Sequence, residues 1–213
     1  PELSFERTRI SAESIYESAS AFDVNNDGNI DIFSGEYWWE GPAFTTKHKV
    51  CTIRREDDYY DDFSNYPMDV NGDGYTDVIT GGWFGETLAW RENPKGQPVE
   101  WTTHEIKKTG NVERPCFYDI DNDGDVEIIP NTKGVWIFKL IRDANGKGTG
   151  QFRETQILEE GAGHGIGIVA MGSLTYTAWA PRFDAAVAAL ARTGALRART
   201  PVPSPALTAM RAD

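Results

Sequence analysis

Three copies of one nine-residue pattern dominate the sequence. They read DVNNDGNID (23–31), DVNGDGYTD (69–77) and DIDNDGDVE (119–127), so the first Asp recurs after 46 and then 50 residues. The likeness extends beyond the pattern, because each copy is flanked by short apolar runs that Gly, Pro and Asn separate. A chain with internal similarity at one period is expected to fold as a repeat protein, here with a unit of about 50 residues.

Each repeat carries four runs that are typical of β-strands. Around the first pattern they are SASAF (18–22), DIFSG (31–35), EYWWE (36–40) and FTTKHKV (44–50). Four short strands per repeat are typical of a β-propeller blade, which buries its two faces against neighbouring blades. Aromatic residues are expected between the blades: Trp38, Trp39, Trp90, Trp101, Trp136 and Phe138. The sequence therefore predicts an all-β fold, a partial β-propeller of about three four-stranded blades with the start of a fourth.

The repeats end abruptly. The predicted blades are 13–58, 59–108 and 109–160, with the start of a fourth at 161–169. Since propellers close with 4–8 blades, we expect a piece of a longer propeller, the alternative being blades from another chain. A fourth pattern is due at residue 169 or 170, but an Ala-, Arg- and Pro-rich tail (170–213) begins there, with five Arg and two Asp in a chain of net charge −12. We expect this tail to be irregular or to form a short helix over 184–196, and a frame change, a fusion joint or a native linker would each explain it.

The oxygen atoms of each pattern indicate a hard divalent cation. Side chains at positions 1, 3 and 5, a main-chain carbonyl at position 7 and a carboxylate at position 9 supply an oxygen shell that suits Ca²⁺ better than Zn²⁺, and Gly at position 6 permits the sharp bend. The predicted ligands are Asp23, Asn25, Asp27, Asn29, Asp31, Asp69, Asn71, Asp73, Tyr75, Asp77, Asp119, Asp121, Asp123, Asp125 and Glu127. An EF-hand needs Glu at position 12, where these repeats have Ser34, Thr80 and Pro130. A polar turn without metal is the remaining alternative, and the three-fold recurrence favours the metal.

Through this D-x-[ND]-x-D-G-x-x-[DE] loop, residues 10–169 resemble the FG-GAP or VCBS-type repeats of calcium-binding β-propellers. The resemblance implies that each loop joins the innermost strand of a blade to the next strand. It also implies Ca²⁺ as the cofactor and a secreted, periplasmic or cell-surface location. The chain lacks the Phe-Gly…Gly-Ala-Pro motif of integrin heads. Its GEYWWEGP (35–42) and GHGIG (163–167) stretches are more similar to propellers of bacterial carbohydrate-associated proteins, rhamnogalacturonan lyases and aldos-2-ulose dehydratase.

Residues about six positions before each pattern are expected at the end of the blades opposite the loops, because a strand of that length spans roughly 20 Å. They include Tyr60, Arg114 and His164. We therefore expect a binding module that presents this face to carbohydrate or to an extracellular protein. The alternative is an enzyme, a polysaccharide lyase or sugar dehydratase, in which these three residues are the catalytic candidates.

Composition argues against two kinds of partner. A net charge of −12 leaves no basic stripe to meet phosphates, so nucleic acid is not expected. No apolar run approaches the roughly 18–20 residues that cross a bilayer as a helix. The predicted partners are therefore carbohydrate or an extracellular protein.

Overall fold

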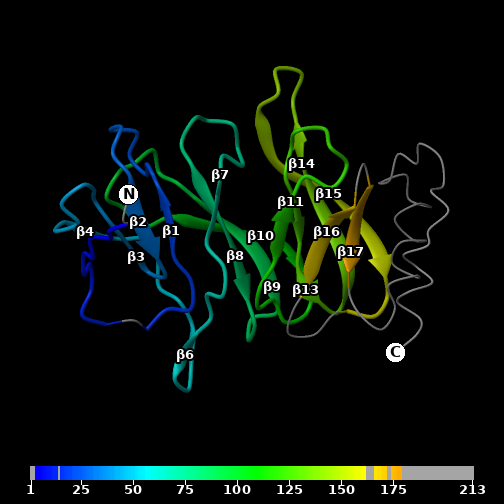
Figure 1. Cartoon of the computed structure of the whole chain (residues 1–213), viewed down its shortest axis with the longest axis horizontal. Helices are drawn as coiled ribbons and strands as arrows, with labels where there is room; N and C mark the ends of the chain where they lie inside the picture. The colour runs from blue at the N-terminus through cyan, green and yellow to red at the C-terminus, as the bar shows by residue number, and fades with distance from the viewer. Residues whose placement is uncertain (1–2, 14, 162–165, 172–173, 179–213) are drawn as a thin grey trace.

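The structure is a computed structural model that describes residues 3–13, 15–161, 166–171 and 174–178 (Figure 1). Within these ranges the fold is all-β, with several antiparallel sheets and no helix. The predicted fold class is therefore confirmed. The predicted helix over 184–196 and the candidate residue His164 lie outside the described ranges.

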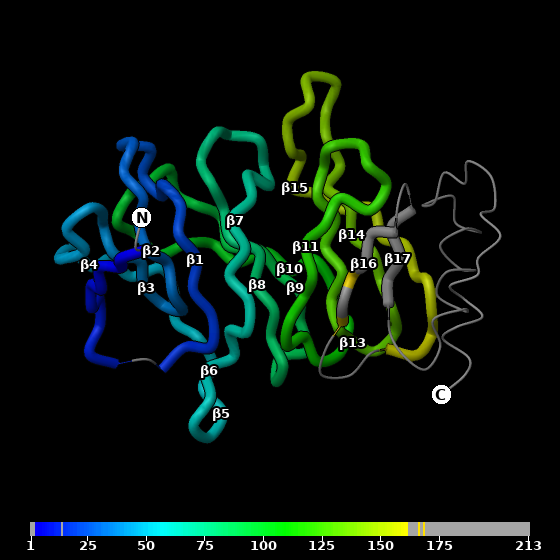
Figure 2. Tube along the Cα trace, in the orientation of Figure 1, coloured from blue at the N-terminus to red at the C-terminus, as the bar shows by residue number. Residues whose placement is uncertain are grey.

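Each of the three repeats forms one antiparallel sheet, and the sheets follow one another along the long axis of the molecule (Figures 1 and 2). The first sheet contains β1 (Ser20–Phe22), β2 (Asp31–Ser34), β3 (Tyr37–Trp39) and β4 (Lys47–Lys49). The second contains β7 (Tyr66–Met68), β8 (Asp77–Gly82), β9 (Thr87–Glu92) and β10 (Thr102–Lys108). The third contains β11 (Cys116–Tyr118), β12 (Glu127–Ile129), β13 (Asn131–Thr132), β14 (Gly134–Arg142) and β15 (Gly148–Leu158).

The nine-residue pattern forms the connection between the first two strands of each sheet. Its first Asp directly follows β1, β7 or β11, and its ninth residue begins β2, β8 or β12. The strand register closes each connection, since the residue before the pattern pairs with position 9: Phe22 with Asp31, Met68 with Asp77 and Tyr118 with Glu127. The three loops are therefore equivalent elements of three equivalent sheets.

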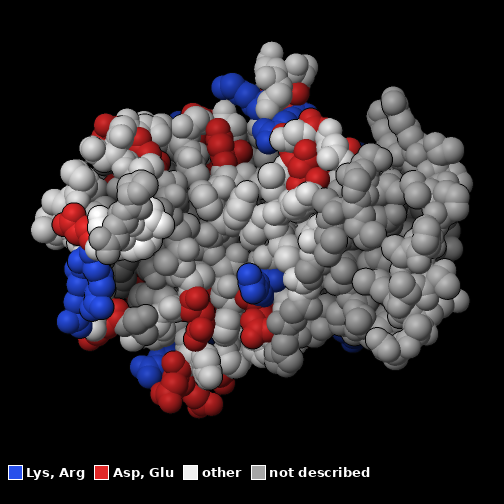
Figure 3. Space-filling view, viewed as in Figure 1, with Lys and Arg blue, Asp and Glu red and all other residues white. Residues whose placement is uncertain are grey.

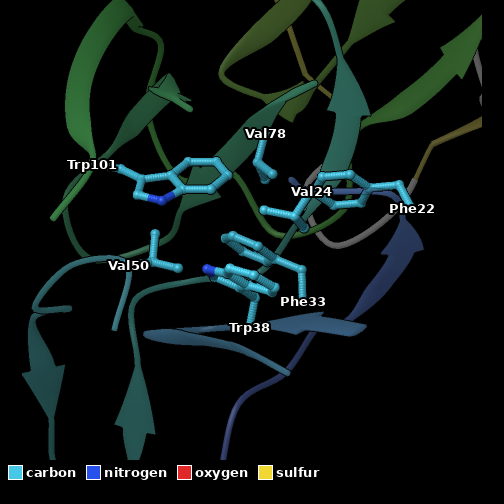
Figure 4. Packing of buried hydrophobic residues seen from close by; sticks show 7 residues of the cluster. All are labelled: Phe22, Val24, Phe33, Trp38, Val50, Val78 and Trp101. Atoms are coloured by element: carbon cyan, nitrogen blue, oxygen red, sulfur yellow. The ribbon is translucent and has the colours of Figure 1, made fainter. Parts of the chain in front are cut away.

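Apolar side chains hold neighbouring sheets together. Figure 4 shows Trp38 and Phe33 of the first sheet beside Val78 and Trp101 of the second repeat, in a cluster that also contains Phe22, Val24 and Val50. A second cluster joins the second and third sheets and contains Trp90, Leu88, Phe138 and Ile128. Four of the predicted aromatic residues are thus buried between sheets, and Trp136 is half-buried against the second cluster.

Trp39 departs from this prediction. Its side chain is half-buried and lines a groove together with the N-terminal segment 8–12. The reason is the alternation of strand side chains: in β3 the neighbouring Trp38 points into the cluster between the sheets, so Trp39 points to the other face.

Two further hairpins stand outside the three sheets. β5 (Arg55–Glu56) pairs with β6 (Tyr59–Tyr60) across the predicted boundary at residues 58 and 59. β16 (Gly167–Met171) falls where the first strand of a fourth blade is predicted, and Ile166 and Ile168 pack against the apolar cluster of the third sheet. It pairs with β17 (Leu174–Ala178), so the described part of the 170–213 tail belongs to strands. The blade boundaries themselves stay a prediction.

Candidate metal centre

The three pattern loops lie at the same end of the molecule, the upper end in Figure 1, and the β5–β6 hairpin lies at the other end. Acidic side chains gather over the loop end in Figure 3. Each loop occupies the same place in its sheet, because it connects the first to the second strand. The oxygen-rich loops and the hairpin that carries Tyr60 are therefore separated by the length of the strands.

Two residues in each loop adopt a left-handed backbone. Gly28, Gly74 and Gly124 at position 6 have φ of 88°, 90° and 97°, a conformation that is open to Gly and strained for residues with a Cβ. Position 4 is also left-handed, with φ of 60°, 72° and 58° at Asn26, Gly72 and Asn122. Asn and Gly are the residues that tolerate this region best. The sequence analysis explained position 6 but overlooked position 4, whose signal is the recurrence of Asn or Gly.

The side chains at positions 1 and 5 turn inward and accept hydrogen bonds from the loop's own main chain. The position-1 carboxylate accepts the N–H of position 6 in each loop, at 2.8 Å for Asp23, 3.1 Å for Asp69 and 2.9 Å for Asp119. The position-5 carboxylate accepts the N–H of position 7, at 2.8 Å for Asp27, 2.9 Å for Asp73 and 3.0 Å for Asp123. The same bonds recur in all three loops, so the carboxylates that were predicted as ligands share one arrangement.

The residue at position 9 is buried and fastens the loop to its sheet. Asp31, Asp77 and Glu127 are 0%, 0% and 2% exposed. Each accepts the main-chain N–H of position 2 in its own loop, at 2.8, 2.9 and 2.8 Å. The donors are the buried apolar residues Val24, Val70 and Ile120. The sequence analysis assigned position 9 to the metal alone, and the apolar residue at position 2 of every copy was the available signal for this second role.

In the first two repeats the second carboxylate oxygen of the position-9 residue also accepts a hydrogen bond. Asp31 Oδ1 accepts the N–H of Gly41 at 2.7 Å, and Asp77 Oδ1 accepts the N–H of Asn93 at 2.8 Å. Burial raises the pKa of Asp77 to about 7, and the N–H groups of Asn93 and Val70 oppose that shift. Burial likewise raises the pKa of Asp31, against the N–H groups of Gly41 and Val24. A cation beside these groups would favour their ionised forms.

Each of the first two loops is also fastened to the repeat that follows it. Asn93, in the connection between β9 and β10, donates from Nδ2 to the carbonyl of Val24 in the first loop at 2.8 Å and to that of Thr76 at 3.0 Å. In the third repeat, Gly150 donates its main-chain N–H to the carbonyl of Val70 in the second loop at 2.8 Å. Main-chain carbonyl groups of both loops are therefore hydrogen-bonded to the repeat that follows.

The third loop contains a group of three acids, Asp119, Asp121 and Glu127, whose ligand atoms lie within 4.8 Å of one another. The Nζ of Lys139 on β14 lies 2.9 Å from Asp121 Oδ2 and 2.8 Å from Glu127 Oε1. Arg142 donates from Nε to Asp125 Oδ2 at 2.8 Å. The third loop thus combines the predicted ligands with two basic side chains of its own repeat.

At the opposite end of the molecule, the contacts described for Tyr60 and Arg114 do not link these two candidate residues. Tyr60 packs edge-on against Tyr16, with ring centroids 4.9 Å apart, and the guanidinium carbon of Arg55 lies over the Tyr60 ring, 5.6 Å from its centroid. Arg114 is exposed and donates its main-chain N–H to Asn131 Oδ1 at 2.7 Å. Neither contact links Tyr60 to Arg114, and His164 is outside the described residues, so the catalytic assignment stays a prediction.

Two carboxylates near Tyr60 have structural roles. Asp61 accepts the main-chain N–H groups of Phe84 at 3.0 Å and Gly85 at 2.7 Å, which fixes the connection between β8 and β9. Asp62 is 0% exposed and forms an ion pair with Arg91. The carboxylates of Asp61 and Asp62 therefore hold the structure at this end and are not available to a ligand.

The comparison with protein families agrees with the geometry of the loops. Residues 69–129 match the family model described as FG-GAP-like repeat. This range begins at the first Asp of the second loop and ends with β12, so it contains the second and third loops. The match supports an FG-GAP repeat protein with a propeller-type, all-β fold. No curated protein matches the chain.

No helix among the described residues is long and apolar enough to cross a membrane.

Proposed function

We propose that the chain is a calcium-binding β-propeller repeat module and that the loops at 23–31 and 69–77 each hold one Ca²⁺. The observation that carries the proposal is the repetition of one set of inward-turned oxygen atoms in both loops, each closed by a buried carboxylate at position 9. Carboxylate, amide and carbonyl oxygens are the ligands that Ca²⁺ prefers, and its flexible coordination tolerates the mixture of Asp and Asn in these loops.

Calcium would act here on stability. The predicted ligands of one loop come from nine consecutive residues, but they converge only when the left-handed positions 4 and 6 and the strand pair are formed. Binding to the folded loop alone stabilises the folded state in proportion to the calcium concentration. Extracellular modules bind Ca²⁺ at about 10⁻⁴–10⁻³ M, so we propose a secreted, periplasmic or surface location in calcium-rich fluid.

Equilibrium dialysis of the full chain against radioactive Ca²⁺ tests this proposal. We expect two bound ions per chain, one fewer in Asp27→Ala and one fewer in Asp73→Ala, because each exchange removes the position-5 ligand of one loop. Asp58→Ala is the matched control, since the Asp58 side chain is 98% exposed in a hairpin away from the loops, and it should bind two. If the chain showed no saturable binding up to about 10 mM Ca²⁺, well above the usual range, the proposal would be wrong.

For the ligand of the module, we propose a carbohydrate with an acidic group. The supporting observation is the groove of about 530 Å³ that Trp39 and Phe44 line together with Arg9 and Lys47. Ligand sites combine apolar and aromatic walls with a few polar groups that fix orientation. Here the aromatic rings offer flat surface to a sugar ring and the two cations favour an anionic substituent. The groove lies beside β3 and the N-terminal segment, so it differs from the face that the sequence analysis favoured.

An array of neutral and acidic oligosaccharides tests the ligand. We expect binding of acidic members and an at least tenfold weaker signal for Trp39→Ala, which corresponds to about 1.4 kcal/mol or more. Tyr59→Ala is the control, because Tyr59 is an exposed aromatic residue on β6, outside the groove. Equal binding by Trp39→Ala and the unaltered chain would exclude the groove. Binding to no glycan would instead favour a protein partner.

A further inference from the structure

We infer that the third loop, 119–127, holds a cation of the chain itself, the ammonium group of Lys139, in place of Ca²⁺. Lys139 Nζ lies 3.0 and 2.9 Å from the two carboxylate oxygens of Asp121, 2.6 Å from Asp123 Oδ2 and 2.8 Å from Glu127 Oε1. These acids occupy positions 3, 5 and 9 of the pattern, three of the five predicted ligand positions. The Lys139 side chain is only 13% exposed, so the ammonium group sits among the carboxylates and is largely shielded from solvent.

The strand register shows that Lys139 occupies the place at which the other two repeats have a glutamate. Val78 pairs with Arg91 on β9, and the next residue is Glu92. In the third repeat the corresponding residue of β12, Ile128, pairs with Phe138 on β14, and the next residue is Lys139. The first repeat has Glu40 at the same place, because Ile32 pairs with Trp39. Two loops therefore have an additional carboxylate beside them, and the third has an ammonium group.

In the first two repeats the glutamate at this place serves another partner. Glu92 Oε2 lies 2.7 Å from His104 Nε2, and Glu40 Oε2 lies 3.3 Å from His48 Nε2. Both histidines stack on a buried Trp of the preceding strand, Trp90 and Trp38. Glu40 thus contacts the fourth strand of its sheet, and Glu92 contacts both the fourth strand and its loop, where Asn71 Nδ2 donates to Glu92 Oε1 at 3.2 Å. Lys139 instead brings a positive charge to its loop.

Two residues of the third loop that differ from the first two loops contact Lys139. Position 9 is Glu127 instead of Asp, and its longer side chain brings Oε1 to Lys139, where the shorter Asp31 and Asp77 accept a main-chain N–H. Position 3 is Asp121 instead of Asn, which gives the ammonium group a two-oxygen contact. The three differences together form one site in which three carboxylates hold the ammonium group of Lys139.

Electrostatics opposes a second cation in this loop. A calcium ion bound by these carboxylates would lie within a few ångströms of the ammonium group, and the two positive charges would repel each other. Calcium would therefore have to displace Lys139 from three carboxylates before it could bind. Burial disfavours the charged form of Lys139, but the hydrogen bonds to Asp123, Glu127 and Asp121 outweigh burial and raise its pKa above the ordinary value.

The expected count of two calcium ions rests on the proposed function, whereas the internal ion in the third loop does not. The test uses the full chain and its Lys139→Gln variant, which removes the charge and leaves a polar side chain one atom shorter. Equilibrium dialysis should give one more bound Ca²⁺ in Lys139→Gln than in the unaltered chain. The control is Arg142→Gln, because Arg142 contacts Asp125, whose predicted metal contact is its main-chain carbonyl, and its count should not change.

A thermal melt in EDTA supplies a second, metal-free readout. Without the ammonium group the third loop has five neighbouring acids and one fewer cation, so Lys139→Gln should melt about 5 °C lower than the unaltered chain, and Arg142→Gln should change far less. Three ions already bound by the unaltered chain, an unchanged count in Lys139→Gln, or an unchanged melt in EDTA would each overturn the inference. If the unaltered chain bound no Ca²⁺ while Lys139→Gln bound one, the inference would stand and the proposed function of the first two loops would fail.

Discussion

Replacing Arg91 with Met is expected to lower the free energy of unfolding by about 3–5 kcal/mol, because it leaves a buried carboxylate without its counter-charge. Arg91 Nη1 lies 2.9 Å from Asp62 Oδ1, and the two side chains are 6% and 0% exposed. Asp62 also accepts hydrogen bonds from Thr80 Oγ1 and Asn65 Nδ2, both at 2.7 Å. These neutral donors remain in the variant, but they do not balance the charge.

Urea unfolding followed by tryptophan fluorescence measures this loss. Arg54→Met is the matched control: Arg54 also pairs with an acid, Glu56, at 2.7 Å, but its side chain is 56% exposed. Exposed pairs contribute about 0.2–1 kcal/mol, so the control should change little. Combining Arg91→Met with Asp62→Asn should recover part of the loss, since the buried charge is then removed as well. A loss at Arg91 no larger than that at Arg54 would contradict the buried pair.

Replacing Asp77 with Ala is expected to destabilise the chain by about 2–4 kcal/mol in EDTA, without any contribution from metal. The exchange leaves two main-chain N–H groups without an acceptor, those of Val70 and Asn93, which Asp77 now holds at 2.9 and 2.8 Å. A buried N–H that loses its partner costs about 1–3 kcal/mol. The loop and the end of β9 should loosen together, because Asp77 contacts both.

Asp73→Ala separates the structural carboxylate from the predicted ligand in the same loop. Asp73 accepts a single N–H, that of Tyr75, at 2.9 Å, and it is only half-buried. In EDTA its loss should therefore cost about 1 kcal/mol or less, while both variants should lose the calcium ion of this loop. Urea unfolding of the two variants with and without Ca²⁺ gives all four values. Equal costs in EDTA would show that position 9 does not fasten the loop.

The sequence predicted the regular part of the molecule well. Runs such as DVITG and TLAWRE are rich in β-branched and aromatic residues and are bounded by turn residues, so local preference and the tertiary fold agree there. The position-6 glycines could be explained in advance, since the bend they allow is a property of the backbone alone. The same reasoning missed the β5–β6 hairpin, because its residues REDDYY are polar and do not alternate.

Lys139 could not be placed from the sequence, and the reason is physical. It lies 12 residues beyond Glu127 along the chain, and only the pairing of β12 with β14 sets it beside the third loop. That register depends on the connection between the strands, which in the third repeat includes the additional strand β13. Contacts that arise from register carry no signature in composition or spacing. The nine-residue pattern therefore predicted three equal sites where the structure distinguishes one from the other two.

The bonds that Asn93 and Gly150 donate to the carbonyls of the preceding loops give the row of repeats a direction. Each of the first two loops is secured by the sheet that comes after it in the chain. Deleting a repeat from the C-terminal side therefore removes the donor to a carbonyl of the loop before it, whereas deleting the first repeat removes from the second loop the bond that Asn26 Nδ2 donates to the carbonyl of Gly74 at 2.9 Å.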